Sequence, residues 1–246
     1  MKHTFFVYLG AAAALFFLWQ MLSLVLHLPI VPSPYAVLLC LQQTFPSTIA
    51  VHTCFSLGRI AAGLFFAVCI GYPLGIFMGY TTWADRILSP FVYLLYPVPK
   101  IALLPILMLL AGVGEISKVL MIFLIIVFQV VIAVRDAVRS IPQETYIPLL
   151  SLGASFFSVF RHVLWPASLP KFITAVRVAM ATAISVLFFT ETFGSQHGLG
   201  YFIMDAWLRV NYLEMYAGIV VLSLLGLFLF SLLDLLEKRV CRWQYK

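Results

Sequence analysis

Long, uninterrupted runs of apolar residues alternate with short polar segments along this chain. No Asp, Glu, Lys or Arg occurs between Lys2 and Arg59. A helix needs about 20 apolar residues to cross a bilayer, and a charge near the bilayer centre costs about 2.5 kcal/mol or more. The runs do not alternate with a period of two, which favours helices over barrel strands. The pattern predicts an all-α polytopic membrane helical bundle with about six transmembrane helices, at residues 4–26, 57–80, 88–110, 117–134, 172–193 and 215–236.

The third of these segments is the least regular. Its sequence includes Pro90, Pro97, Pro99, Lys100 and Pro105. Proline removes a backbone hydrogen-bond donor, and its ring clashes with the preceding turn of a helix. Neighbouring helices or water can satisfy the freed carbonyl groups inside a bundle. We therefore expect this segment to be kinked or broken.

Composition supports the same class of protein. The chain is 63% hydrophobic and 10% charged, with a mean hydropathy of +1.07. Soluble domains are closer to half apolar and a quarter charged. We expect a single transmembrane domain over residues 1–246.

Lysine and arginine are distributed unevenly between the two sides of the predicted bundle. If the N-terminus lies inside, the cytoplasmic side receives Lys2, Arg86, Arg135, Arg139, Arg161, Lys171, Lys238, Arg239, Arg242 and Lys246, with Arg177 at its edge. The other side receives only Arg59, Lys118 and Arg209. The positive-inside rule then places both termini and the loop 135–171 in the cytoplasm. The net charge of +6 reflects this topology and contact with anionic lipid headgroups, not nucleic-acid binding.

The second segment carries a small residue at every fourth position. These residues are Gly63, Ala67, Gly71, Gly75 and Gly79. Helical geometry places them on one face, where small side chains let two helices approach closely in lipid. The face is compatible with tight packing and also with sliding during a conformational cycle.

Three polar residues inside the apolar segments are candidates for a translocation path. Ionisable groups within a bundle are costly and are functional candidates by default. Glu191 could line such a path or bond to a neighbouring helix, and Gln129 could do the same. Lys100 follows Pro99, so it could attract an anionic solute or extend into a wet cavity.

No enzymatic or metal-binding chemistry is indicated. The chain contains no GxxxxGK[ST] phosphate loop, because no glycine is followed directly by lysine. Neither the four cysteines nor the five histidines have the spacing of a metal site or a catalytic group. We therefore expect no catalytic residue, no metal ligand and no cofactor in this chain.

Residues 140–166 differ from the rest of the sequence. This segment, SIPQETYIPLLSLGASFFSVFRHVLWP, is polar enough to be wetted and apolar enough to form short amphipathic helices. It lies between two strongly apolar stretches, on the predicted cytoplasmic side. A plain amphipathic loop on the membrane surface is the alternative to a partner-binding element.

The spacing within this segment resembles the cytoplasmic EAA loop of ABC-importer permeases. That pattern is Glu-Ala-Ala, three residues, Gly, nine residues and Ile-x-Leu-Pro. Gly153 takes the glycine place, Val163 the Ile place and Pro166 the proline place, while Trp165 replaces Leu. The Glu-Ala-Ala part is absent, because 147–149 reads Ile-Pro-Leu. Glu144, about one turn upstream, is a candidate to stand in for the missing acid.

Further motifs resemble permeases of the nitrate/sulfonate/taurine type. They are Tyr96-Pro97-Val98-Pro99, Leu104-Pro105, the turn 112–118, Leu152-Gly153-Ala154-Ser155, Arg161-His162-Val163 and Gly198-Leu199-Gly200-Tyr201. They occur in the family's order between about residues 57 and 236. The chain is thereby identified as resembling the binding-protein-dependent inner-membrane component of an ABC importer.

The resemblance implies a mechanical role for residues 140–166, called the coupling loop from here on. In this family the loop forms a short helix that docks into a groove on an ATP-binding subunit. The residues this implies for ATPase coupling are Glu144, Ile147, Leu150, Gly153, Ala154, Ser155, Val163 and Pro166. Gly153 suits a bend with positive φ, and we expect Pro166 to end the second loop helix before the fifth segment.

The resemblance also implies partners and a location. These are two ABC ATPase subunits that bind ATP and magnesium, a second permease copy forming a homodimer, an extracytoplasmic solute-binding protein and the bilayer of a bacterial inner membrane. Related permeases serve nitrate, taurine, alkanesulfonates and thiamine-precursor pyrimidines.

Two other classes of protein are alternatives. An ion-gradient-driven secondary transporter would favour inverted repeats and two interrupted helices in matching halves, whereas one interrupted segment is predicted here. An integral-membrane enzyme would need clustered acidic, histidine, serine or cysteine residues at a membrane surface.

Overall fold

The computed structural model describes residues 2–244, with residues 2–9 and 244 described by their backbone only. The predicted inner position of Lys246 therefore lies outside the described residues. All regular structure within residues 2–244 is helical, as the apolar pattern predicts. The chain divides into two compact units. One contains the residues up to Ser56 with Gln196–Leu224, and the other contains Leu57–Ser195 with the residues from Leu225 onward.

The first unit is built on the chain's early helices. Its elements are α1 (Lys2–Leu26), α2 (Pro34–Thr44), a π-helical turn at Phe45–Ile49, the beginning of α3 (Ala50–Tyr80), α10 (Leu199–Leu208) and the beginning of α11 (Tyr212–Val240). The hydroxyl of Ser33 accepts a hydrogen bond from the backbone N–H of Ala36, which caps α2. Neither α2 nor α10 was predicted, because both are shorter than a membrane span.

The backbone at the start of α10 is held by side chains of α3. Gly198 N–H donates to Nδ1 of His52 at 3.0 Å, and Leu199 N–H donates to the hydroxyl of Ser56 at 2.8 Å. These bonds satisfy two donors that the first turn of a helix leaves without intrahelical partners.

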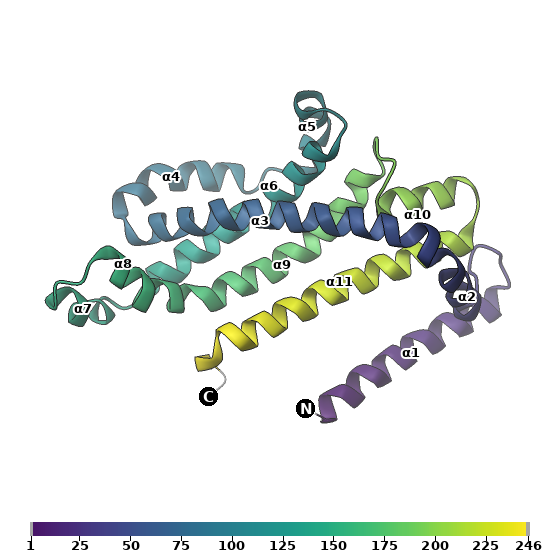
Figure 1. Ribbon diagram of the computed structural model, residues 1–246, viewed down its shortest axis with the longest axis horizontal. Helices are drawn as coiled ribbons and strands as arrows, with labels where there is room; N and C mark the ends of the chain where they lie inside the picture. The colour runs from purple at the N-terminus through teal and green to yellow at the C-terminus, as the bar shows by residue number, and fades with distance from the viewer. Residues whose placement is uncertain (1, 245–246) are drawn as a thin grey trace. The chain divides into compact units, whose positions relative to one another are not determined.

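The second unit contains the remaining long helices and the coupling loop (Figure 1). Its elements are the rest of α3, α4 (Thr82–Leu95), a 3₁₀ turn at Lys100–Leu103, α5 (Leu104–Ala111), α6 (Glu115–Arg139), a 3₁₀ turn at Gln143–Thr145, α7 (Ile147–Ser151), α8 (Phe156–Val159), a π-helical turn at Phe160–Leu164, α9 (Trp165–Glu191) and the end of α11. Helices α6 and α9 pack against each other extensively.

The small-residue face of α3 lies directly against α6. A Cβ atom placed on Gly63 would lie 2.5 Å from a side-chain carbon of Ile122, and one placed on Gly79 would lie 2.6 Å from Cβ of Val138. Ala67, on the same face, is fully buried. The residue numbers of each glycine and its partner differ by the same amount at both ends of the contact. Helices α3 and α6 therefore run parallel and keep one register along the contact. The close helix packing that the spacing predicts is therefore present.

The predicted break in the third segment is confirmed. Helices α4 and α5, the latter with its preceding 3₁₀ turn, are bent by 83° at residues 96–99. Pro97 and Pro99 lie in this bend. By length and composition, four described helical stretches can cross a membrane, or five if the bent pair is one span. The count of six therefore stays a prediction.

The expectation that Pro166 ends the second loop helix is wrong. The helix that begins at Phe156 continues without interruption to Glu191, and Pro166 lies in the first turn of α9. A π-helical turn precedes it, in which Trp165 N–H bonds to the carbonyl of Phe160. This wider turn accommodates the proline, whose ring would clash with a carbonyl in a regular helix interior.

Candidate functional site

The coupling loop folds into two helical arms joined by a tight turn: the short helix α7 and the first turns of the long helix that begins at Phe156. Gly153 has φ +72°, so the positive φ expected of it is confirmed. Its N–H donates to the carbonyl of Leu150, and Ala154 N–H donates to the carbonyl of Leu149, both at 3.0 Å. This pair of bonds is a Schellman motif, which ends α7 and redirects the chain toward α8.

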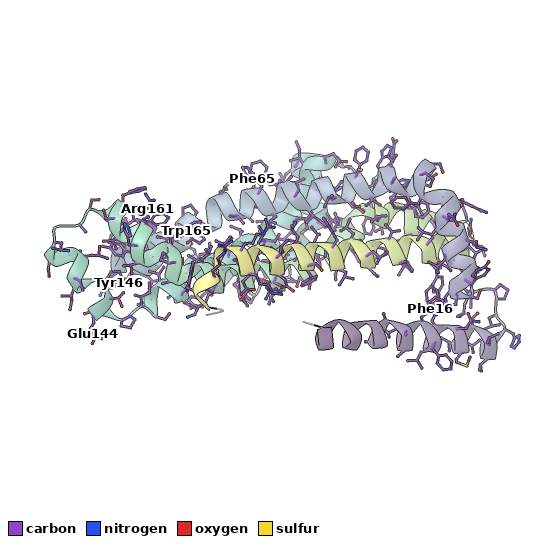
Figure 2. The ribbon with its side chains drawn as sticks, turned by 60° about the horizontal axis from the view of Figure 1, so that its bottom comes forward. Phe16, Phe65, Glu144, Tyr146, Arg161 and Trp165 are labelled. Carbon is purple, nitrogen blue, oxygen red and sulfur yellow. The ribbon has the colours of Figure 1, made fainter. Side chains whose placement is uncertain are left out.

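The loop exposes large apolar side chains. Leu152 is 86% exposed and Phe157 is 68% exposed, and Ile147 and Leu150 are also more than half exposed. Figure 2 shows Glu144 at the edge of the loop, pointing away from the helices. A wetted loop that keeps such side chains uncovered is typical of a surface that binds a partner.

A groove of about 420 Å³ lies between the loop and the ends of α3 and α6. We call it the loop groove; its lining is Gly79, Tyr80, Val138, Arg139, Ile141, Gln143, Tyr146, Ile147 and Leu150. The ring of Tyr80 contacts the rings of Tyr146 and Phe156, with centroids 6.2 and 5.5 Å apart. Burial raises the pKa of Tyr146. The groove walls thus combine apolar and aromatic side chains with one amide, Gln143, and one cation, Arg139.

The other predicted coupling residues have different surroundings. Val163 is 5% exposed and belongs to the π-helical turn, so it anchors the loop rather than lining its surface. Ser155 precedes α8 and is exposed.

Lys100 caps the end of α4 at the bend. Its ammonium group donates to the carbonyls of Leu95 and Tyr96 at 2.7 and 2.5 Å. It also lies 4.9 Å from the ring centroid of Phe128 on α6. A cation at a helix C-terminus interacts favourably with the exposed carbonyls and the helix dipole. Lys100 thereby stabilises the broken backbone.

Gln129 lines a separate hollow of about 620 Å³ in the second unit. We call it the Gln129 hollow; its lining is Tyr96, Gln129, Ile132, Ala133, Asp136, Pro170, Lys171, Thr174, Ala175, Val178 and Glu237. Gln129 and Tyr96, the first residue of the bend, thus line one hollow, and the carbonyl of Tyr96 accepts a hydrogen bond from Lys100. The hollow has charged groups of both signs and an apolar wall.

Glu191 lies elsewhere, in a buried ion-pair network. Its carboxylate is fully buried and lies 2.6 Å from Nη1 of Arg59, which is 3% exposed. Arg59 also donates to Glu115 through Nε and Nη2, both at 2.6 Å. Removing one partner of a buried pair costs about 3–5 kcal/mol, because the other charge remains buried. Of the two roles considered for Glu191, the bond to a neighbouring helix is the one its geometry provides.

Sequence reasoning missed several charged residues of this unit. Arg59 and Lys118 were interpreted only as outer-side charges, yet both are buried. Asp85 and Arg135 are also buried and paired with each other at 2.5 Å. The sequence does place each of these charges inside or beside an apolar segment. Such a position predicts that the charge is paired with another group, but it does not identify that group.

These features define a class of protein. A helical membrane bundle with a broken span and an exposed apolar loop between two long helices is compatible with a membrane transport protein. The chain belongs to the family described as Binding-protein-dependent transport system inner membrane component, which matches residues 71–242.

Individual relatives agree with this membership. The chain is 33% identical over 232 residues to the taurine transport system permease protein TauC of Escherichia coli (strain K12), covering 92% of this chain and 84% of that protein. It is 27% identical over 245 residues to the formylaminopyrimidine transport permease protein ThiX of Halalkalibacterium halodurans, covering 97% and 98%.

The fold is similar to that of a solved transporter. An inward-facing structure of the MetNI methionine ABC transporter aligns with a TM-score of 0.62 and 22% identity, covering 76% of this chain and 92% of that chain. The chain is therefore a transmembrane permease subunit of an ABC importer. Its relatives are transport permeases, consistent with a non-catalytic subunit with ATPase and binding-protein partners.

Proposed function

We propose that the coupling loop is the docking site for an ATP-binding subunit and that its movement drives solute import. The observation that carries this proposal is an exposed apolar loop beside an apolar, aromatic groove. Ile147 and Leu150 line that groove while remaining more than half exposed, so they can contact a partner. Gly153, Ala154 and Ser155 form the turn that sets the angle between the two arms. Glu144 supplies an exposed acid at the loop's edge.

The assembly follows from this role. Two ATPase subunits bind ATP and magnesium, and each contacts one copy of this permease, giving a homodimer in the membrane. The coupling loop and both termini then face the cytoplasm, where ATP is available, and a solute-binding protein delivers the solute on the other side. The excess of basic residues on the loop side supports this orientation.

The solute path proposed for this chain passes the Gln129 hollow. Gln129 and Thr174 offer hydrogen bonds, and the lining carries charges of both signs, from Lys171 and from the acids Asp136 and Glu237. A small zwitterionic aminosulfonate such as taurine, which the name of TauC specifies for that protein, matches this lining.

Purification tests the assembly. The permease expressed with its ATPase should copurify with it in detergent, and the complex should hydrolyse ATP. The permease expressed alone should show no ATP hydrolysis above that of an empty-vector preparation. A transport-active preparation that contains no ATPase would refute the proposed function.

A further inference from the structure

Asp85 is the centre of a buried ion-pair network between α4 and α6. Its Oδ1 accepts from Nε of Arg135 at 2.5 Å and from the hydroxyl of Ser89 at 2.6 Å. Its Oδ2 accepts from Nη1 of Arg139 at 2.5 Å. Arg135 also donates through Nη1 to the hydroxyl of Tyr93 at 2.8 Å. Its guanidinium group therefore bonds to two residues of α4, Asp85 and Tyr93. Asp85 and Arg135 are each 8% exposed.

This network is the main buried attachment of α4. Within α4 only Ala84, Asp85 and Val92 are buried, and most of its large apolar side chains are exposed. Because so few side chains of α4 are buried, the position of this helix depends strongly on the contacts that these few side chains make. The charge-assisted bonds of Asp85 are directional, and they therefore fix the position of α4 along α6.

The same network reaches two functional regions. Arg139 lines the loop groove, next to Tyr146 and Ile147 of the coupling loop. At the other end of α4, Tyr96 follows the last residue of the helix, begins the bend and lines the Gln129 hollow. A displacement of the loop that moves Arg139 would thus pull on Asp85, because the two side chains are bonded. Since α4 is a continuous helix, a shift of Asp85 would also shift Tyr96 at its other end.

We propose that Asp85 is a positioning residue that transmits movement of the coupling loop to the broken span beside the Gln129 hollow. This inference rests on the proposed docking of an ATPase on the coupling loop. Asp85 contacts neither solute nor ATPase in this scheme. It acts by holding Arg139 and Arg135 of α6 to the first turn of α4.

A labelling experiment tests this transmission without knowledge of the solute. Tyr96→Cys is introduced into a variant that lacks the native cysteines, in the complete complex with its ATPase. The rate of reaction with a thiol reagent is measured without nucleotide and after vanadate trapping, in which the ATPase hydrolyses ATP and then retains ADP with vanadate in place of the released phosphate. We expect trapping to change the rate roughly tenfold, a typical size for coupling between sites. Asp85→Asn should reduce this change to less than about twofold while ATP hydrolysis continues.

Asp234→Asn is the matched control. Asp234 also forms an ion pair with an arginine of another helix, Arg177, at 2.7 Å, but Arg177 keeps Glu237 as a second partner. This variant should retain the full change in labelling. An unchanged response in Asp85→Asn would overturn the inference.

A second variant covers the case in which Asp85→Asn does not accumulate. Arg139→Gln leaves the Asp85–Arg135 pair intact, and the Arg139 side chain is 48% exposed, so folding should be preserved. Loss of the labelling change with the ATPase still bound supports transmission. Loss of ATPase binding, or a wild-type labelling change, contradicts it. Failure of the unmodified complex to retain an ATPase would instead refute the proposed function.

Discussion

Replacement of Gly75 by leucine should prevent folded permease from accumulating. A Cβ atom at Gly75 would lie 2.8 Å from Cβ of Val134 and 2.9 Å from the backbone carbonyl oxygen of Val131. Relief of these contacts requires α3 and α6 to separate, because a backbone atom cannot rotate away. Overpacking of this kind costs about 1–3 kcal/mol or more. Separation of the two helices would also weaken the contacts that the other glycines of this face make with α6. The yield and melting temperature of detergent-purified protein measure the effect.

Gly58→Leu provides the matched control on the same helix. A Cβ atom at Gly58 has nothing within 4 Å, so leucine there should leave yield and melting temperature close to those of the parent. Equal stability of the two variants would show that the small-residue face of α3 does not need its close contact with α6.

Gly153→Val should uncouple ATP hydrolysis from transport while leaving the membrane helices intact. A Cβ atom at Gly153 meets nothing within 4 Å, so the substitution has room, and its effect comes from φ +72° alone. This conformation costs about 1–2 kcal/mol for most residues, and more for a β-branched one. The turn should therefore rearrange and misplace the two loop arms. We expect transport per ATP hydrolysed to fall roughly tenfold in proteoliposomes.

Two control variants separate loop geometry from general strain. Gly153→Asn should retain most coupling, because asparagine tolerates the left-handed conformation. Gly112→Val introduces backbone strain at another positive φ, +78°, in the turn before α6, and should not alter coupling in the same way. Normal coupling in Gly153→Val would show that this turn does not set the docking geometry.

The sequence predicted the features of this fold that depend on local chemistry. Long apolar runs predict helices because each run must satisfy its own backbone groups in lipid. The bend at 96–99 follows from two prolines in four residues. The turn at Gly153 follows from a glycine between two short amphipathic stretches. Each of these depends on neighbours within a few residues.

The features it missed depend on the tertiary arrangement. Arg59 and Glu191 are 132 residues apart in sequence, and Asp85 and Arg135 are 50 apart. Nothing in the pattern of a single helix identifies such a partner. Pro166 was assigned to a helix end because proline usually disrupts a helix interior, whereas the π-helical turn before it removes that conflict.

Site-specific photo-cross-linking tests the central claim most directly. A photoreactive amino acid is placed either at Leu152 in the coupling loop or at Leu109 in α5, side chains that are each 86% exposed. The complex with its ATPase is then irradiated in intact membranes. If the coupling loop receives the ATPase in the cytoplasm, the probe at Leu152 should cross-link to the ATPase and the probe at Leu109 should not. Cross-linking of the ATPase from Leu109 but not from Leu152 would contradict both the docking site and the orientation of the chain.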